Sequence, residues 1–142
     1  MRVDFYILDA GSAAECLHFA CRLTEKAYGL DSRVHAHTSS PADAAKLDEM
    51  LWTFRQGSFV PHEVLETGMP ARAPVSIGSG NDHPDQGDLL VNLSEEPPAF
   101  AEKFARIAEI VGSDEASRAA GRERFRHYRD LGIEPTTHQI GA

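Results

Sequence analysis

The most distinctive chemistry in this sequence lies in an arginine-rich segment near the carboxyl end. Residues 118–129 contain five arginines and a single glutamate. At about 100° per helical residue, one narrow arc of a helix would carry four of the arginines and one aromatic ring. The arc consists of Arg118, Arg122, Phe125, Arg126 and Arg129. Surface helices usually interleave both signs of charge, whereas this arc contains no acid. Because guanidinium groups bind carboxylates in a fork and a ring offers an apolar contact, the arc predicts a site for an acidic peptide with a hydrophobic residue.

A second group of residues combines a tryptophan with an apolar loop. Trp52 falls off the apolar stripe of its predicted helix, and Phe59, Val60 and Pro61 follow in a segment without a regular pattern. An exposed cluster of this kind is the usual mark of a protein interface. Burial against a neighbouring helix or sheet explains the same residues equally well, so the sequence leaves both interpretations open.

Residues that could catalyse a reaction or hold a cofactor are few and lack the neighbours they would need. Asp9 begins the turn Asp9-Ala10-Gly11, but the segment has neither a GxGxxG nor a GxxxxGK[ST] pattern to cradle phosphate. His35 and His37 share one face of a strand without a third metal ligand nearby. The acids and histidine at 82–85 are better explained as solvated loop charge, and no nucleophile elbow is present. We therefore expect no catalytic residue, no metal and no cofactor.

The elements that must position these residues are strands alternating with helices. Apolar or alternating runs predict strands at 3–8, 33–38, 74–78 and 88–93, while 106–111 fits a strand or a helix. Helices are predicted to begin at the caps Ser12, Ser40 and Ser113. Residues 133–142 are expected to form a C-terminal tail after a single domain at 1–132. The alternation predicts an α/β fold of three layers, Rossmann-like, with a mostly parallel sheet and helices on both faces.

Charge and hydropathy set limits on partners and location. The 142 residues carry a formal net charge of −8. Such a chain repels phosphates at long range, so we expect no direct tight binding of nucleic acid. No apolar run approaches the ~20 residues of a membrane span, and the first residues are too short in their apolar part for a signal peptide. Together with Cys16 and Cys21, which read as core cysteines of a reducing compartment, this predicts a cytoplasmic protein without membrane contact.

Five stretches follow one another in a specific order along nearly the whole chain. They are DFYIL near the start, LDEMLWTFRQGSFVPHE at 47–63, APVSI at 73–77, DLLVNLS at 88–94 and GRERFRHYRDLG at 121–132. In this order they resemble the chi subunit of the bacterial DNA polymerase III holoenzyme. The resemblance implies a Rossmann-like fold without nucleotide chemistry, with a strand at 106–111. It also implies a non-catalytic accessory subunit, associated with the clamp loader, that links single-stranded DNA-binding protein to the replicase.

The resemblance further implies which residues meet the acidic C-terminal tail of single-stranded DNA-binding protein. The residues of the family's tail pocket fall on Val111, Arg118, Arg122, Phe125 and Arg126. Lysines expected at two of these positions are arginines here, and a tyrosine is Phe125, so charge and ring are kept and a phenol hydroxyl is lost. Arg124, on the opposite side of the helix, is expected to be dispensable for tail binding.

A second implied partner is the psi subunit of the clamp loader. Trp52 and Phe59 match the family's psi-binding residues, and Val60 and Pro61 belong to the same block. The same surface could meet another replisome protein. The alternative function is a small α/β nucleotide-binding protein or enzyme with its site at the carboxyl ends of the strands.

Overall fold

The computed structural model describes residues 1–10 and 12–141. The helices are α1 (Ala13–Gly29), α2 (Pro41–Thr53), the short 3-10 helix η1 (Ala101–Lys103) and α3 (Glu115–Asp130). The strands are β1 (Arg2–Leu8), β2 (Val34–Thr38), β3 (His62–Val64), β4 (Val75–Ser79), β5 (Gly87–Asn92), β6 (Phe104–Val111) and β7 (Thr136–Ile140). Gly11, part of the turn predicted after β1, lies outside the described residues. Within them, no helix is both long and apolar enough to cross a membrane.

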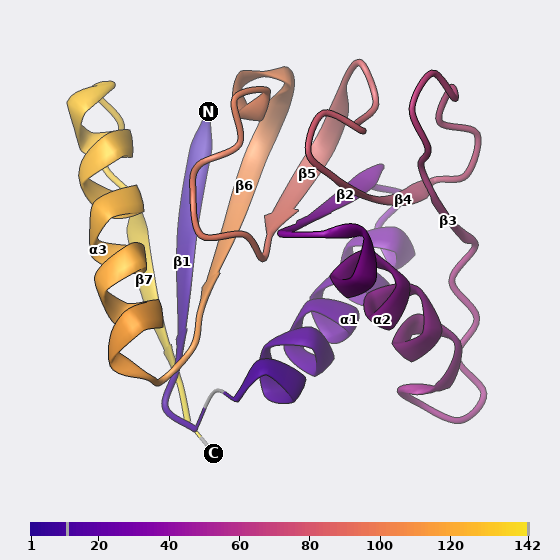
Figure 1. The fold of residues 1–142 in the computed structure, drawn as a ribbon, viewed down its shortest axis with the longest axis horizontal. Helices are drawn as coiled ribbons and strands as arrows, with labels where there is room; N and C mark the ends of the chain where they lie inside the picture. Colours follow the sequence, from indigo (N-terminus) through magenta and orange to yellow (C-terminus); the bar gives the residue numbers. More distant parts are fainter. Residues whose placement is uncertain (11, 142) are drawn as a thin grey trace.

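The strands of the described residues form one seven-stranded sheet in the order β3-β4-β2-β5-β6-β1-β7 (Figure 1). Each pairing in this sheet is parallel. The ambiguous segment 106–111 belongs to β6, between β5 and β1, as the family resemblance implies. Parallel neighbours need crossover connections, which here contain α1, α2, α3 or the short η1, or, between β3 and β4, a loop. The predicted α/β class with a parallel sheet is confirmed.

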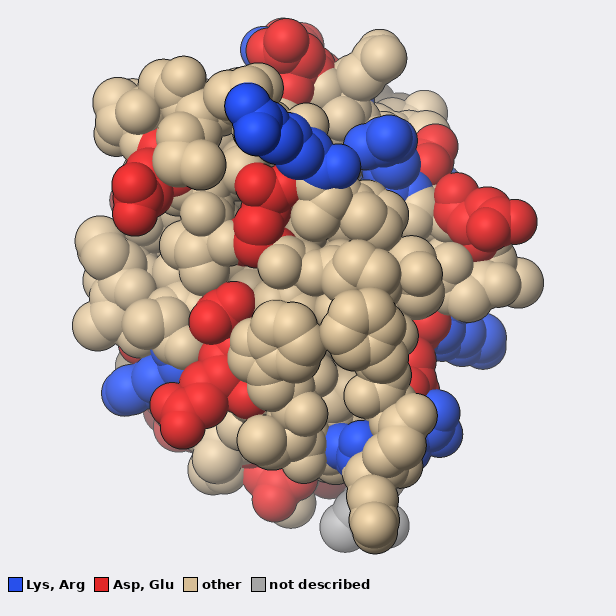
Figure 2. Space-filling view, turned by 90° about the vertical axis from the view of Figure 1, so that its right-hand side faces the viewer, with Lys and Arg blue, Asp and Glu red and all other residues tan. Residues whose placement is uncertain are grey.

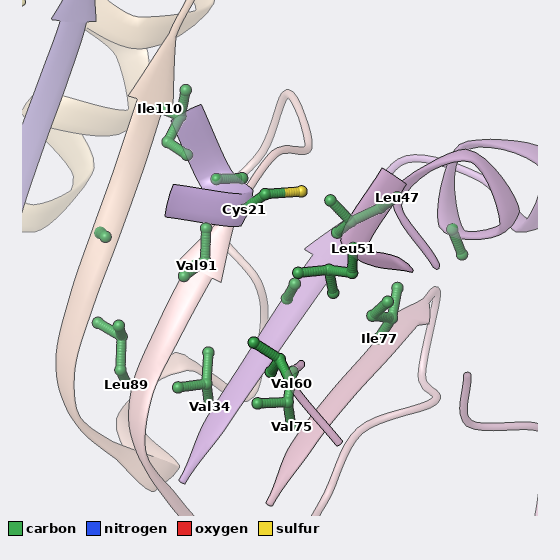
Figure 3. Packing of buried hydrophobic residues seen from close by; sticks show 14 of the residues in the cluster. Cys21, Val34, Leu47, Leu51, Val60, Val75, Ile77, Leu89, Val91 and Ile110 are labelled. Atoms are coloured by element: carbon green, nitrogen blue, oxygen red, sulfur yellow. The ribbon is translucent and has the colours of Figure 1, made fainter. Parts of the chain in front are cut away.

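Side chains on both faces of the sheet are buried by helices, which makes three layers. On one face, α1 and α2 pack against strand residues, as Leu47 and Leu51 of α2 do near Ile77 of β4 (Figure 3). On the other face, Tyr128 of α3 and residues of η1 pack with Phe5. Each sheet face thus has its own core, and α3 lies on the opposite side of the sheet from α1 and α2.

Capping side chains determine where the long helices begin. Ser12 and Ser40 each accept a hydrogen bond from the backbone N–H three residues later, at 3.2 and 3.1 Å. The cap of α3 is Asp114, whose carboxylate accepts from the backbone N–H and the hydroxyl of Ser117 at 3.0 and 2.6 Å. The predicted cap Ser113 is therefore off by one residue. A carboxylate at this position also interacts favourably with the helix dipole.

The segment expected to be a C-terminal tail contains an edge strand. Residues 136–140 form β7, which pairs in parallel with β1 from Asp4 opposite Thr136 to Leu8 opposite Ile140. Its side chains are mostly polar and partly exposed, so the strand lacks the apolar alternation by which strands are recognised. Residues 62–64, predicted to be irregular, form β3 at the opposite edge of the sheet. This strand also lacks an apolar alternation, because it has only three residues and two of them are polar.

Candidate protein-binding surfaces

The arginine-rich helix α3 contacts the sheet through a narrow strip. A Cβ atom added to Gly121 would lie 3.0 Å from both Cγ atoms of Val111, so the helix backbone approaches β6 closely. Phe125 packs on Phe5 of β1, with ring centroids 5.2 Å apart. The opposite side of α3, which carries most of its arginines, faces solvent.

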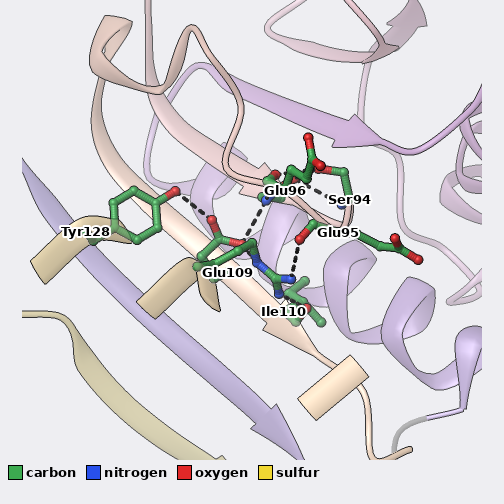
Figure 4. Close-up of polar contacts among 8 residues, drawn as sticks. Ser94, Glu95, Glu96, Glu109, Ile110 and Tyr128 are labelled. Carbon is green, nitrogen blue, oxygen red and sulfur yellow. Dashed lines mark hydrogen bonds and ion pairs between the residues drawn. The ribbon is translucent and has the colours of Figure 1, made fainter. Parts of the chain in front are cut away.

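Arg124 differs from its neighbours because its guanidinium group is buried. Its Nε donates to Oε1 of Glu109 on β6 at 2.8 Å, and the two side chains are 4% and 0% exposed. The hydroxyl of Tyr128 and the amide of Asn92 donate to the same carboxylate at 2.6 and 2.8 Å (Figure 4). Arg124 also donates to carbonyl oxygens of β6 and of the segment after β5. These four side chains form a buried polar network that ties α3 to β5 and β6.

The network shifts the pKa of two of its groups. Burial raises the pKa of Tyr128, and the neighbouring Glu109 adds to the effect, so the phenol keeps its proton and donates. Burial also raises the pKa of Glu109, against the opposing charge of Arg124. Arg124 is therefore a core residue that holds α3 in place. Its expected dispensability for tail binding stays a prediction, but its burial makes it a poor control for that binding, because its replacement should disturb the fold.

The exposed arginines of α3 border an open depression. It has a volume of about 470 Å³ and is lined by Arg122, Phe125, Arg126, Arg129 and Asp130. Phe125 is half-buried and lines the depression together with three arginines. The arrangement offers several charge-assisted donors beside one apolar ring, which is the chemistry expected for an acidic peptide with a hydrophobic residue.

Acids accompany these arginines in space, although the arc itself contains none. Arg122 pairs with Glu115 at 3.0 Å, Arg126 with Glu123 at 3.1 Å, and Arg129 with an acid beyond the helix at 3.7 Å. All these side chains are more than 60% exposed. Exposed pairs of this kind contribute little stability, so a ligand carboxylate can replace them at small cost.

Val111 and Arg118 do not line the depression. Val111 is 3% exposed and packs beneath Gly121. Arg118 is half-buried, and its guanidinium donates to the carbonyl oxygens of Gly112 and Leu8 at 3.1 and 3.4 Å. The structure therefore brings Arg122, Phe125 and Arg126 together around the depression, whereas Val111 and Arg118 do not line it.

The tryptophan cluster is exposed. Trp52 at the end of α2 and Phe59 in the following loop are 53% and 66% exposed, with ring centroids 5.9 Å apart. Trp52 also rests on His62, at 4.4 Å between centroids. Figure 2 shows a broad area of uncharged residues on this side of the molecule, with charged side chains around it. Pro61 is half-buried at this surface, but Val60 is 1% exposed and belongs to the core, which corrects its predicted place in the patch.

The carboxyl ends of the strands, where the alternative function would have its site, border a cavity of about 300 Å³. Its charged lining includes Asp43, Lys46, Glu95 and Asp114, with the ion-paired Arg124. Three carboxylates against one lysine repel phosphate, so the cavity does not suit a nucleotide.

The histidine pair on β2 is likewise part of the packed interior. Nδ1 of His35 lies 2.7 Å from the hydroxyl of Ser76, and the rings of His35 and His37 both contact Phe100. Burial lowers the pKa of His35 to about 3, and the neighbouring histidines add to the effect. In residues 1–10 and 12–141, no group of three or more His, Cys, Asp or Glu side chains could hold a metal ion.

Comparison with known proteins decides the family. The family model described as "DNA polymerase III chi subunit, HolC" matches residues 1–136. The chain belongs to the DNA polymerase III chi subunit family. It is 40% identical to the chi subunit of Pseudomonas aeruginosa, over 98% of this chain and 96% of that protein. It is 30% identical to the chi subunit of Haemophilus influenzae, over 97% and 96% of the two chains. For the chi subunit of Escherichia coli the identity is 28%, over 94% of each. The resemblance inferred from the sequence is confirmed.

The same α/β fold occurs in solved structures of other proteins. The C-terminal domain of the DEAD-box protein Dbp5 superposes with a TM-score of 0.65 at 15% identity, over 96% of this chain and 90% of that one. The likeness concerns the α/β fold alone. It agrees with a parallel sheet between two helical layers.

Proposed function

We propose that this chi-family protein is a non-catalytic accessory subunit of DNA polymerase III that binds the acidic C-terminal tail of single-stranded DNA-binding protein. The observation that carries the proposal is the depression on α3, where Arg122, Arg126 and Arg129 surround Phe125. Membership of the chi family supports the link to the polymerase. The tail would lay its carboxylates on the guanidinium groups and its apolar end on the ring.

The physical case rests on how little the free protein loses when the tail binds. The arginines are exposed and pair only with exposed acids, so a ligand carboxylate can replace those acids at small cost. Burial of the opposite strip of α3 holds the helix still, which keeps the guanidinium groups in position. In this account Val111 acts indirectly by supporting the helix beneath Gly121, and Arg118 by fixing its first turn to the end of β1.

The exposed rings of Trp52 and Phe59 form the second proposed contact, with the psi subunit or another replisome protein. Exposed aromatic pairs are common anchors of protein interfaces. They belong to α2 and the loop after it, on the opposite side of the sheet from α3. One protein could therefore hold the tail and the polymerase assembly at the same time, which is what a linking subunit requires.

A titration of the purified protein with a fluorescein-labelled C-terminal peptide of single-stranded DNA-binding protein tests the proposal. Binding should weaken as salt rises, because exposed charge pairs are screened. A peptide with asparagine and glutamine in place of its acids should bind far more weakly. If affinity stays the same in low and high salt, or if the amide peptide binds equally well, the α3 site is not a carboxylate site.

A further inference from the structure

A second basic and apolar groove lies on the other side of the sheet, between α1 and the β1–β7 edge. It has a volume of about 390 Å³. Its apolar lining comes from α1, β1, β5 and β7 and includes Phe19, Leu23, Leu89 and Ile140. Leu30, just after α1, is 72% exposed at the same groove. A groove of this shape has room for one aliphatic or aromatic side chain of a partner.

Two cations on one side of the groove have no acidic partner among the described residues. Arg22 and Lys26 are one turn apart on α1, and both are exposed. In the described part of the chain, no carboxylate lies within ion-pair distance of either. The Arg22 guanidinium sits 5.4 Å from the ring centroid of Phe19, which holds it beside the apolar surface. This contrasts with α3, where each exposed arginine of the depression already has an acid beside it.

The third cation of the groove, Arg106, already forms hydrogen bonds within the protein. It donates to Asp4 at 3.0 Å and to the hydroxyl of Tyr6 at 2.6 Å. Asp4 is fully buried and also accepts from His138 at 2.9 Å. Burial acts to raise the pKa of Asp4, but the bonds from His138 and Arg106 hold it below the ordinary value, so the carboxylate stays ionised. Arg22 and Lys26 are thus the charges left for a ligand.

We propose that this groove binds an acidic peptide segment of a partner protein, with an apolar side chain in the groove and its carboxylates on Arg22 and Lys26. Charge complementarity is the argument: two cations without an acidic partner in residues 1–10 and 12–141 border an apolar groove in a chain of net charge −8. A nucleic acid fits less well. The two aromatic rings at the groove are already occupied, because Arg22 lies over Phe19 and Tyr6 stacks on His138, so they make a poor stacking platform for bases.

The experiment first removes the α3 site, so that its success or failure is separate. The starting protein carries Arg122→Glu and Arg126→Glu. It is titrated with a fluorescein-labelled peptide in which aspartate alternates with leucine, and binding is followed by fluorescence anisotropy. We expect salt-sensitive binding that falls by about tenfold or more when Arg22→Glu and Lys26→Glu are added.

Matched controls separate the groove from general charge. Arg72→Glu with Lys103→Glu makes the same charge change at exposed positions away from the groove and should leave affinity nearly unchanged. A peptide with asparagine in place of aspartate should not bind. Since all the substituted side chains are exposed, each variant should keep the circular dichroism spectrum of the parent. The proposal is overturned if the starting protein does not bind the acidic peptide, if both pairs of reversals weaken it equally, or if labelled oligothymidine binds the groove as tightly as the peptide.

Discussion

Replacing Arg124 by alanine should destabilise the protein more than any other arginine substitution on α3. The variant removes the cation and its carbonyl contacts, but leaves Glu109 fully buried with only Tyr128 and Asn92 as donors. Breaking a buried ion pair by deleting one partner typically costs ~3–5 kcal/mol, because the remaining charge is uncompensated. Arg126→Ala, which removes a pair that is 68% and 70% exposed, should cost less than ~1 kcal/mol.

The loss of unfolding free energy caused by Arg124→Ala should depend on pH. Without Arg124, the buried Glu109 has a folded pKa well above its unfolded value. The folded state then binds the extra proton as pH falls, so the deficit is largest at high pH and shrinks as pH drops through the raised pKa. Urea denaturation from neutral to mildly acidic pH measures this, and Arg124→Ala with Glu109→Gln should recover part of the loss. The reasoning is refuted if Arg124→Ala costs less than ~1 kcal/mol, or if its deficit grows as pH falls.

Three further predictions concern other parts of the molecule. Trp52→Ala and Phe59→Ala should keep the fold and tail-peptide binding, because both rings are exposed. Each variant should capture less psi or polymerase assembly in a pull-down. A loss of helical circular dichroism in either variant would contradict the interface assignment. Below pH 6.5, His35 is protonated in the unfolded chain but stays neutral in the folded protein, where its pKa is about 3. The free energy of unfolding should therefore fall by up to ~1.4 kcal/mol per pH unit from this group as the pH drops. His35→Leu should flatten that slope in acid denaturation, and an unchanged slope would show that His35 is not its source. Labelled oligothymidine should bind the wild-type protein poorly without its protein partner, since the net charge is −8; tight binding at moderate salt would contradict this.

Local pattern was enough to predict most of the fold and the exposed part of the candidate site. Buried strands are apolar runs, and capped helices carry an apolar stripe, so both leave signals within a few residues. Helical spacing also placed Arg122 and Arg126 together, because 3.6 residues per turn fixes which side chains share a face. Edge strands gave no such signal, since β7 pairs on one side and carries exposed polar residues.

What local pattern could not show was which polar residues have distant partners. Arg124 reads as one more surface arginine until Glu109, fifteen residues earlier on another element, is placed beside it. Val60 reads as part of an exposed loop, yet its side chain enters the core under α2. Nothing in the sequence around Arg22 and Lys26 indicates a binding site, because the groove beside them is completed by residues of β1, β5, β6 and β7 that are distant in sequence.

The most direct test of tail binding at α3 is a titration of the labelled tail peptide against Arg122→Ala and Arg122→Glu at fixed salt. Arg122 lines the depression beside Phe125 and Arg126, and its present partner Glu115 is 85% exposed. Losing one charged hydrogen bond should weaken binding by roughly ten- to a hundredfold, and the charge reversal should weaken it further. Arg72→Glu, at an exposed arginine outside the depression, is the matched control and should bind nearly as the wild type does. Equal losses for Arg122→Glu and Arg72→Glu would mean that only overall charge matters, and would contradict a specific tail site on α3.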